Sequence, residues 1–213
     1  MNENEVKKEI NFCHNDLTKD LYDLYKKSSY LAVDTEAMGL IHGRDRLCLV
    51  QICNETNLTS CIKIELKTSF SPNLQNLFED QKIKKIFHYA RFDVAALKCN
   101  LGINTTNIFC TKIASKLART YTNKHGLKDL INELLRIELD KSSQSSDWGN
   151  TEDLSIEQLD YAANDVRFLI EAMHKLKVIL EREGRYNLAQ NCFGTIPVHA
   201  ELDILKFSNI FEH

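Results

Sequence analysis

Four carboxylates and one tyrosine, each set in an apolar segment, have the residue types of a hydrolytic metal site. They are Asp34, Glu36, Asp93, Asp165 and Tyr161. Hard cations such as Mg²⁺ prefer oxygen ligands, and a pair of these ions held by several carboxylates can bind both the attacking and the leaving oxygen of a phosphodiester. The five residues therefore predict metal-dependent hydrolysis of nucleic acid.

The first two acids end an apolar run. Residues 30–33 have the pattern of a short strand that leads directly into Asp34-Thr35-Glu36. Because side chains alternate along a strand, Asp34 and Glu36 are expected on the same face. Two carboxylates would then project together from one strand.

The other three residues belong to segments with helical character. Residues 154–180 read as one long amphipathic helix, in which Tyr161 and Asp165 lie one turn apart on the same face. Asp93 follows a predicted strand at 84–88 and opens a helical run, so it is expected near a helix N-terminus. Any one of these acids could simply be a cap or a solvated side chain. The set of five in one chain argues against that explanation.

The rest of the pattern alternates between strands and helices. Residues 46–53 and 59–64 read as strands joined by a polar turn, which indicates antiparallel pairing. This order predicts an α/β fold in which the acids meet on one side of a mixed sheet. Further elements are expected at 73–80 (helix), 92–100 (helix), 107–110 (strand) and from 111 onwards (helices), with a polar loop between 138 and 153.

The chain resembles the DEDD superfamily of 3′-5′ exonucleases, in the branch with a tyrosine in its third motif, to which RNase D belongs. The motifs lie at 34–40, 88–93 and 161–165, in the order of the superfamily. The resemblance implies an RNase H-like fold, with a mixed central sheet flanked by helices, in a single exonuclease domain over residues 1–213.

The same resemblance implies roles for the five residues. Asp34, Glu36, Asp93 and Asp165 would hold two divalent ions, Mg²⁺ or Mn²⁺, and Tyr161 would orient the attacking water. A phenol has a reference pKa of about 10, so Tyr161 is not expected to act as a strong base. The products would be 5′ nucleoside monophosphates released from the 3′ end.

A more specific resemblance is to the nano-RNase C family of alphaproteobacteria, whose members degrade very short RNA. It rests on the segments 44–48, 109–117, 119–122, 125–128 and 144–148. It implies a short RNA substrate, foremost a diribonucleotide, and a homo-oligomer, by analogy an octameric ring. The apolar C-terminal segment 194–213 could lie at a subunit interface or be covered by the domain itself.

Four residues are candidates for substrate binding. Leu40 follows Glu36 in a Glu-x-x-Gly-Leu spacing that resembles oligoribonuclease, where the leucine separates the two bases of a dinucleotide. His125 and Lys128, near the start of a predicted helix, and Arg119 are candidates for a terminal phosphate, because helix N-termini favour anions. The alternatives are a core position for Leu40 and a solvated basic face or subunit contact for the other three.

Two aromatic residues near the motifs have open roles. His88 belongs to the second motif and is expected to support the site by hydrogen bonding rather than to bind metal. Trp148 could stack on a base or anchor a loop.

Composition favours a small substrate. The chain carries 27 Lys and Arg against 30 Asp and Glu, a formal net charge of −3, whereas proteins that follow long nucleic-acid backbones have extensive basic surfaces. Its 213 residues, 43% of them hydrophobic, can build one core but leave no room for the accessory domains of RNase D. Three other functions remain open: RNase D-like trimming of structured RNA 3′ ends, a DNA 3′-5′ exonuclease, and a non-catalytic RNA-binding protein.

The cysteines and the N-terminus indicate the compartment. Seven cysteines without a CxxC pair, in a chain whose first residues lack an apolar export signal, are typical of reduced thiols in a cytoplasmic protein. No apolar stretch is as long as a membrane span. We therefore expect a soluble cytoplasmic enzyme without disulfides.

Overall fold

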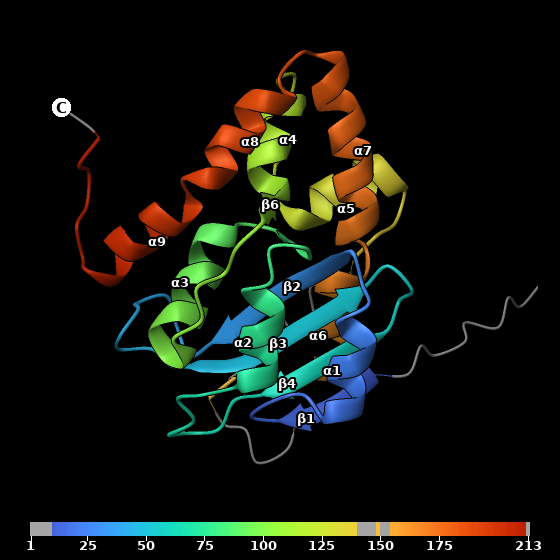
Figure 1. Ribbon diagram of the computed structural model, residues 1–213. Helices are drawn as coiled ribbons and strands as arrows, with labels where there is room; N and C mark the ends of the chain where they lie inside the picture. The colour runs from blue at the N-terminus through green and yellow to red at the C-terminus, as the bar shows by residue number, and fades with distance from the viewer. Residues whose placement is uncertain (1–9, 140–147, 150–153, 212–213) are drawn as a thin grey trace, which may run out of the picture.

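The computed structural model describes residues 10–139, 148–149 and 154–211. Its centre is a six-stranded mixed sheet with the strand order β1-β4-β3-β2-β5-β6 (Figure 1). The strands β2, β3 and β4 pair antiparallel, as predicted, while β1 runs parallel to β4, and β2, β5 and β6 run parallel to one another. The strands are Ile10–His14 (β1), Tyr30–Ala37 (β2), Leu47–Asn54 (β3), Thr59–Lys63 (β4), Lys84–Phe87 (β5) and Ile108–Cys110 (β6). The predicted α/β class with a mixed sheet is confirmed.

Helices cover both faces of this sheet. Figure 1 shows α1 and α2 in front of the strands and α6 behind them, where α6 packs on β2, β3 and β4. The helices α4, α5, α7 and α8 pack against one another beside β5 and β6. The helices are Lys19–Tyr25 (α1), Pro72–Phe78 (α2), Ala90–Leu101 (α3), Thr111–Ala118 (α4), Leu127–Leu135 (α5), Ile156–Arg167 (α6), Leu169–Arg182 (α7), Tyr186–Gly194 (α8) and Ile196–Ile204 (α9).

Strand β2 lies in the middle of the sheet and carries the first two acids. Its residues Leu31, Ala32 and Val33 are fully buried, since both faces of a central strand are covered. The strand continues to Ala37, so the acids lie within it rather than after its end. Pairing with β3 sets Asp34 directly opposite Gln51.

The prediction of one long helix over 154–180 is wrong in one respect. The segment forms two helices, α6 and α7, separated at Phe168. Helix α6 begins with a capping box, in which the Ser155 hydroxyl accepts a hydrogen bond from the backbone N–H of Gln158 and the Gln158 side chain accepts one from the Ser155 N–H. Helix α6 packs on the sheet, whereas α7 packs on α4 and α5. The break at Phe168 lets the two halves follow these different partners.

Helix α3 begins two residues earlier than predicted. It starts at Ala90 after Tyr89, whose φ of +83° lies in the left-handed region that bulky residues rarely adopt. Lys112 holds its ammonium 4.4 Å from the centre of the Tyr89 ring. Because the helix begins at Ala90, Asp93 lies in its first turn, as the sequence predicted.

Other expectations have mixed outcomes. The short elements β1 and α1 were not predicted, and most of the polar loop expected at 138–153 lies outside the described residues. All seven cysteines are in the part of the chain that the structure describes, and none forms a disulfide there. Across the described ranges, every helix is too short or too polar to cross a bilayer.

Candidate active site

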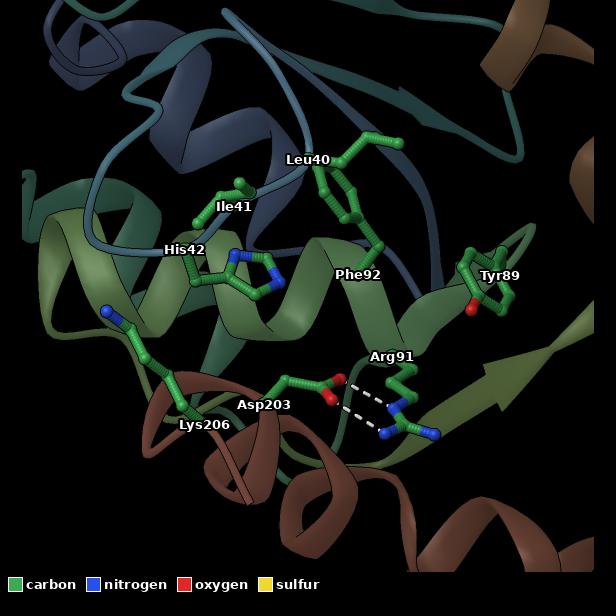
Figure 2. Close-up of a pocket in the computed structure, with 8 residues that line it drawn as sticks. All are labelled: Leu40, Ile41, His42, Tyr89, Arg91, Phe92, Asp203 and Lys206. Carbon is green, nitrogen blue, oxygen red and sulfur yellow. Dashed lines mark hydrogen bonds and ion pairs between the residues drawn. The ribbon is translucent and has the colours of Figure 1, made fainter. Parts of the chain in front are cut away.

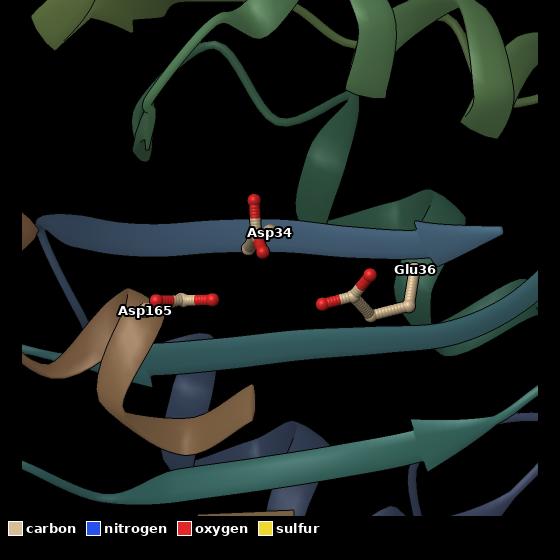
Figure 3. Close-up of side chains that lie close together, drawn as sticks. All are labelled: Asp34, Glu36 and Asp165. Carbon is tan, nitrogen blue, oxygen red and sulfur yellow. The ribbon is translucent and has the colours of Figure 1, made fainter. Parts of the chain in front are cut away.

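Three carboxylates from two distant segments converge at the centre of the sheet. Asp34 and Glu36 project from the same face of β2, and Asp165 reaches them from α6, which lies across that face (Figure 3). One oxygen from each carboxylate can be chosen so that all three atoms lie within 4.8 Å of one another. Such a group of oxygens has the size and chemistry of a divalent cation site.

The fourth acid lies beside this group rather than within it. Asp93 is 3% exposed and accepts a hydrogen bond of 2.7 Å from the Thr35 hydroxyl, which fixes one of its carboxylate oxygens. Its charge acts on both Asp34 and Glu36 and raises their pKa values. The structure therefore brings all four predicted acids to one place, with Asp93 held by the strand that carries the first two.

Burial raises the pKa of every acid in the set, and the charges of neighbouring carboxylates raise the pKa values of Asp34 and Glu36 further. Burial is the main cause for all four, and it raises the pKa of Glu36 to about 8, of Asp93 to about 7 and of Asp165 to about 6. The pKa of Asp34 is also raised, first by burial and then by the charges of Asp93, Asp165 and Glu36. A bound cation would relieve this repulsion, so the residues present fit a divalent metal site.

Tyr161 acts as a hydrogen-bond donor in this environment. Its pKa is raised by burial and by the nearby charge of Asp165, and the phenol hydrogen bonds to the Asp165 carboxylate, which lowers the pKa of that acid. The hydroxyl therefore stays protonated at neutral pH. This agrees with a role in orienting a water molecule and argues against a role as a base.

A cavity of about 290 Å³ opens beside Asp34, Tyr161 and Asp165. The start of α5 and lysine side chains from α4 and α5 also line this cavity. The remaining lining residues are His88, Lys112, Gly126, Leu127, Lys128, Asp129 and Leu139. Carboxylates and lysines that line one cavity suit a ligand that carries both metal-bound and free phosphate oxygens.

His88 also lines this cavity. Its Nδ1 is 2.9 Å from the Thr111 hydroxyl, which donates to the backbone carbonyl of Phe87 at 3.1 Å. Burial, followed by the charge of Lys112, lowers the pKa of His88 to about 4, so the ring is neutral at neutral pH. Its Nε2 is buried and has no hydrogen-bond partner within the described ranges. The ring is thus held by Thr111, in line with a supporting role.

Leu40 projects from the loop between β2 and β3. It is 80% exposed and lines a second hollow, of about 470 Å³, together with Tyr89, Arg91 and Phe92 (Figure 2). Arg91 in turn makes two hydrogen bonds of 2.5 and 2.6 Å to Asp203 of α9. Leu40 is therefore no core residue, and its exposed side chain can meet a ligand.

Glycine is required at position 39 for space rather than for a sharp turn. The φ of Gly39 is not positive, but a Cβ there would lie 2.3 Å from an Asp45 carboxylate oxygen. That carboxylate accepts a hydrogen bond of 3.0 Å from the Ile41 N–H and is paired with Arg44. Asp45 thus closes the loop that presents Leu40.

The three basic candidates for substrate binding have different surroundings. Lys128 lines the cavity, whereas His125 does not and instead has its Nδ1 2.9 Å from the Ser115 hydroxyl. Arg119 is fully buried and paired with Glu133, so its guanidinium is not available to a phosphate. The expectation of direct contact for Arg119 does not agree with its burial, because the sequence does not reveal that Glu133 lies next to it.

Some residues of the site were not anticipated. Thr35 stands between the two acids in the sequence and could have been found by asking what the opposite face of the strand contacts. Gln51 interrupts the apolar run of β3, is 0% exposed and lies opposite Asp34, so a buried polar residue at this position could have been noticed in the sequence. Trp148, for which the sequence left two roles open, is 4% exposed and packs with Leu49 and Ala162, which agrees with an anchoring role.

Comparison with known proteins agrees with this geometry. The model of a family described as 3′-5′ exonuclease matches residues 10–181. The chain belongs to this exonuclease family. A relative within the family, ribonuclease D of Sphingobium indicum, is 31% identical over 159 residues, which are 75% of this chain and 40% of that protein. The chain thus spans about two fifths of the length of this relative.

Solved structures in the family include proteins of similar length. NrnC of Brucella melitensis bound to pGG is 45% identical and superposes with a TM-score of 0.91, covering 97% of this chain and 100% of the other. The same protein with bound Mg²⁺ is 45% identical with a TM-score of 0.89, covering 96% and 98%. These likenesses confirm the predicted RNase H-like exonuclease fold and the resemblance to nano-RNase C.

Proposed function

We propose that this chain is a metal-dependent 3′-5′ exoribonuclease that cleaves diribonucleotides to 5′ nucleoside monophosphates. The observation that carries the proposal is the group of three carboxylates, whose oxygens lie within 4.8 Å of one another. The chain that holds them is 45% identical in sequence to NrnC, whose structure has been solved with pGG bound. The remaining family activities, trimming of structured RNA ends and DNA hydrolysis, are alternative outcomes of the test below.

The acids account for metal binding. Asp34, Glu36 and Asp165 would hold two divalent ions, Mg²⁺ or Mn²⁺, with Asp93 completing the set from its position beside Thr35. When bound, such ions activate water and stabilise the departing oxygen of a phosphodiester. Tyr161, which keeps its proton, would orient the water, and Lys112 and Lys128, which line the same cavity, would bind phosphate oxygens.

Leu40 would separate the two bases of a dinucleotide. Its side chain is exposed on the loop that follows Glu36, and the hydrogen bond from the Ile41 N–H to Asp45 holds this loop in place. We expect Leu40→Ala to raise the KM for a dinucleotide without changing the Mg²⁺ requirement. Leu66→Ala is the control, since Leu66 is also exposed, at 72%, but lines none of the described cavities.

The test compares substrates of different length and sugar. We would incubate the protein with 5′-labelled RNAs of two to seven nucleotides, a folded tRNA precursor and DNA duplexes, each with Mg²⁺, with Mn²⁺ and with a chelator. The proposal expects a strong preference for the two-nucleotide RNA and no hydrolysis in chelator. Preferential trimming of the tRNA precursor or of DNA would replace the proposal by the corresponding alternative.

Assembly into a homo-oligomer, by analogy an octameric ring, is part of the proposal. Its support is a row of exposed apolar side chains at the C-terminal end: Leu205, Phe207, Ile210 and Phe211, which are 52–72% exposed. Light scattering on the purified protein tests it. A monomeric mass for the wild-type protein would contradict assembly. An oligomeric mass that Phe207→Asp leaves unchanged would contradict assembly through this segment.

A further inference from the structure

Arg119, the residue that ends α4, is the largest fully buried side chain of the described chain. Each nitrogen of its guanidinium has a partner. Nε donates to one Glu133 oxygen at 3.0 Å and Nη2 donates to the other, while Nη1 donates to the Ser115 hydroxyl at 2.9 Å and to the Lys124 carbonyl at 2.8 Å. Four of the five N–H donors of the guanidinium are thus used by the protein.

A buried arginine is stable only when such partners surround it, because removal of its charge from water is costly. The hydrogen bonds from Arg119 lower the pKa of Glu133 to about 2, so the pair stays ionised at neutral pH. Apolar residues of similar volume often stabilise a core as well as an ion pair does. Stability alone therefore gives no reason for an ion pair between α4 and α5.

Arg119 joins α4, α5 and the segment between them. Glu133 belongs to α5, Ser115 to α4, and Lys124 to the connection that leads into α5. The Ser115 hydroxyl also lies 2.9 Å from His125 Nδ1, which fixes the next residue of the connection. One side chain thus sets both the path of the connection and its position relative to the two helices.

The connection leads directly into the wall of the active-site cavity. Gly126, Leu127, Lys128 and Asp129 follow His125 and line the same cavity as Asp34, Tyr161 and Asp165. The backbone of His125 also interacts with the imidazole of His88, which lines the same cavity. A shift of the connection would move Lys128 and the first turn of α5 away from the acids.

We propose that Arg119 is a positioning residue that, through Glu133, Ser115 and Lys124, holds the start of α5 and Lys128 in place to receive the substrate's phosphate. The inference rests on the proposed function and deepens it. A wall preformed in this way lowers the ordering cost of binding, so its loss should weaken substrate binding and leave the metal site intact.

The test uses variants that keep the guanidinium and remove one partner. Glu133→Gln removes the ion pair, and Ser115→Ala removes the bridge to His125. The matched control is Glu201→Gln, which removes another ion pair between helices, that of Glu201 with Lys98. The Glu201 side chain is 41% exposed, compared with 36% for Glu133. Glu201 lines none of the described cavities.

Three quantities would be measured for each variant: KM and kcat for a diribonucleotide, the Mg²⁺ concentration for half-maximal activity, and the melting temperature. We expect Glu133→Gln and Ser115→Ala to raise KM about tenfold, a loss of about 1.4 kcal/mol in binding, with kcat and the Mg²⁺ requirement within about twofold of wild type. Glu201→Gln should leave KM unchanged.

A purely structural role gives a different pattern. If Glu133→Gln and Ser115→Ala lower the melting temperature while KM, measured well below that temperature, matches that of Glu201→Gln, the positioning role is wrong. Arg119→Lys is a second check, because lysine keeps the charge but cannot bond all of these partners, so its KM should rise at least as much. A wild-type protein inactive on every diribonucleotide would overturn the proposed function itself, and this inference with it.

Discussion

Thr35 and Asp93 link the strand and the helix that carry the metal-binding candidates. The Thr35 hydroxyl, which lies between Asp34 and Glu36 in the sequence, donates a hydrogen bond of 2.7 Å to Asp93 of α3. This bond opposes the effect of burial on the Asp93 carboxyl and keeps its pKa from rising further. Strand β2 thus supplies two acids and orients a third.

Thr35→Val is therefore expected to weaken metal binding with little change in shape. A hydrogen bond to a charged group contributes about 1.5–3 kcal/mol, so the Mg²⁺ concentration for half-maximal activity should rise about tenfold or more. The measurement is a Mg²⁺ titration of activity or of the melting temperature. Thr105→Val is the control, since Thr105 is buried but its hydroxyl has no partner in the described structure. Equal titration midpoints for the two variants would contradict the role of Thr35.

Asp34→Asn should have opposite effects on activity and on stability. Without metal, burial and then the charges of Asp93, Asp165 and Glu36 disfavour the ionised Asp34 carboxylate, which is why its pKa is raised. Removal of its charge should abolish metal-dependent hydrolysis but increase the free energy of unfolding in chelator at pH 8 by roughly 1 kcal/mol or more. Thermal melts in chelator test this against Asp20→Asn, an exposed acid of α1. A lower melting temperature for Asp34→Asn would show that the carboxylate has a structural role.

The metal-free protein should lose stability as pH rises. The folded-state pKa values of Asp165, Asp93 and Glu36, at about 6, 7 and 8, lie above the ordinary carboxyl values of about 4, so the folded state binds more protons than the unfolded state in this range. The stability from these groups is complete below about pH 4 and is lost as pH rises towards 8. Mg²⁺ replaces those protons, so its stabilising effect should be larger at pH 8 than at pH 5.

This linkage can be measured directly. Melting temperatures at pH 5, 6, 7 and 8, with a chelator and with Mg²⁺, should diverge as pH rises. Hydrolysis at a fixed, low Mg²⁺ concentration should increase over the same range, because metal and protons compete for the carboxylates. A pH-independent gap between the two melting curves would mean that these carboxylates do not bind the metal.

Gln51→Leu should stabilise the protein. Both amide atoms of Gln51 are buried without a hydrogen-bond partner in the described residues, and an unsatisfied buried polar group costs about 1–3 kcal/mol. We expect the free energy of unfolding to rise by about 1 kcal/mol. Asn54→Leu is the contrasting variant, because the Asn54 side chain is also buried but bonds Ser28, Thr56 and Leu58, and its loss should destabilise. A destabilised Gln51→Leu would indicate a partner for the amide, such as ordered water beside Asp34.

Several features could be predicted because they depend on residues close together in the chain. Alternation along β2 places Asp34 and Glu36 on one face, and helical spacing places Tyr161 one turn from Asp165. The polar turn between β3 and β4 correctly predicted their antiparallel pairing. Arg119 illustrates the limit, since a basic residue beside a predicted helix has the same sequence pattern whether it faces solvent or is enclosed by α5.

The amino-acid sequence by itself determined the α/β class, the membership in an exonuclease family and the identity of the acids, because each follows from short-range spacing and motif order. Only the tertiary structure decided how those acids meet, that Thr35 holds Asp93, that the long helix breaks at Phe168, and that Arg119 is buried against Glu133, Ser115 and Lys124. These features arise from packing between elements that are far apart in the chain. A pattern of neighbouring residues does not indicate which distant elements of the chain pack together.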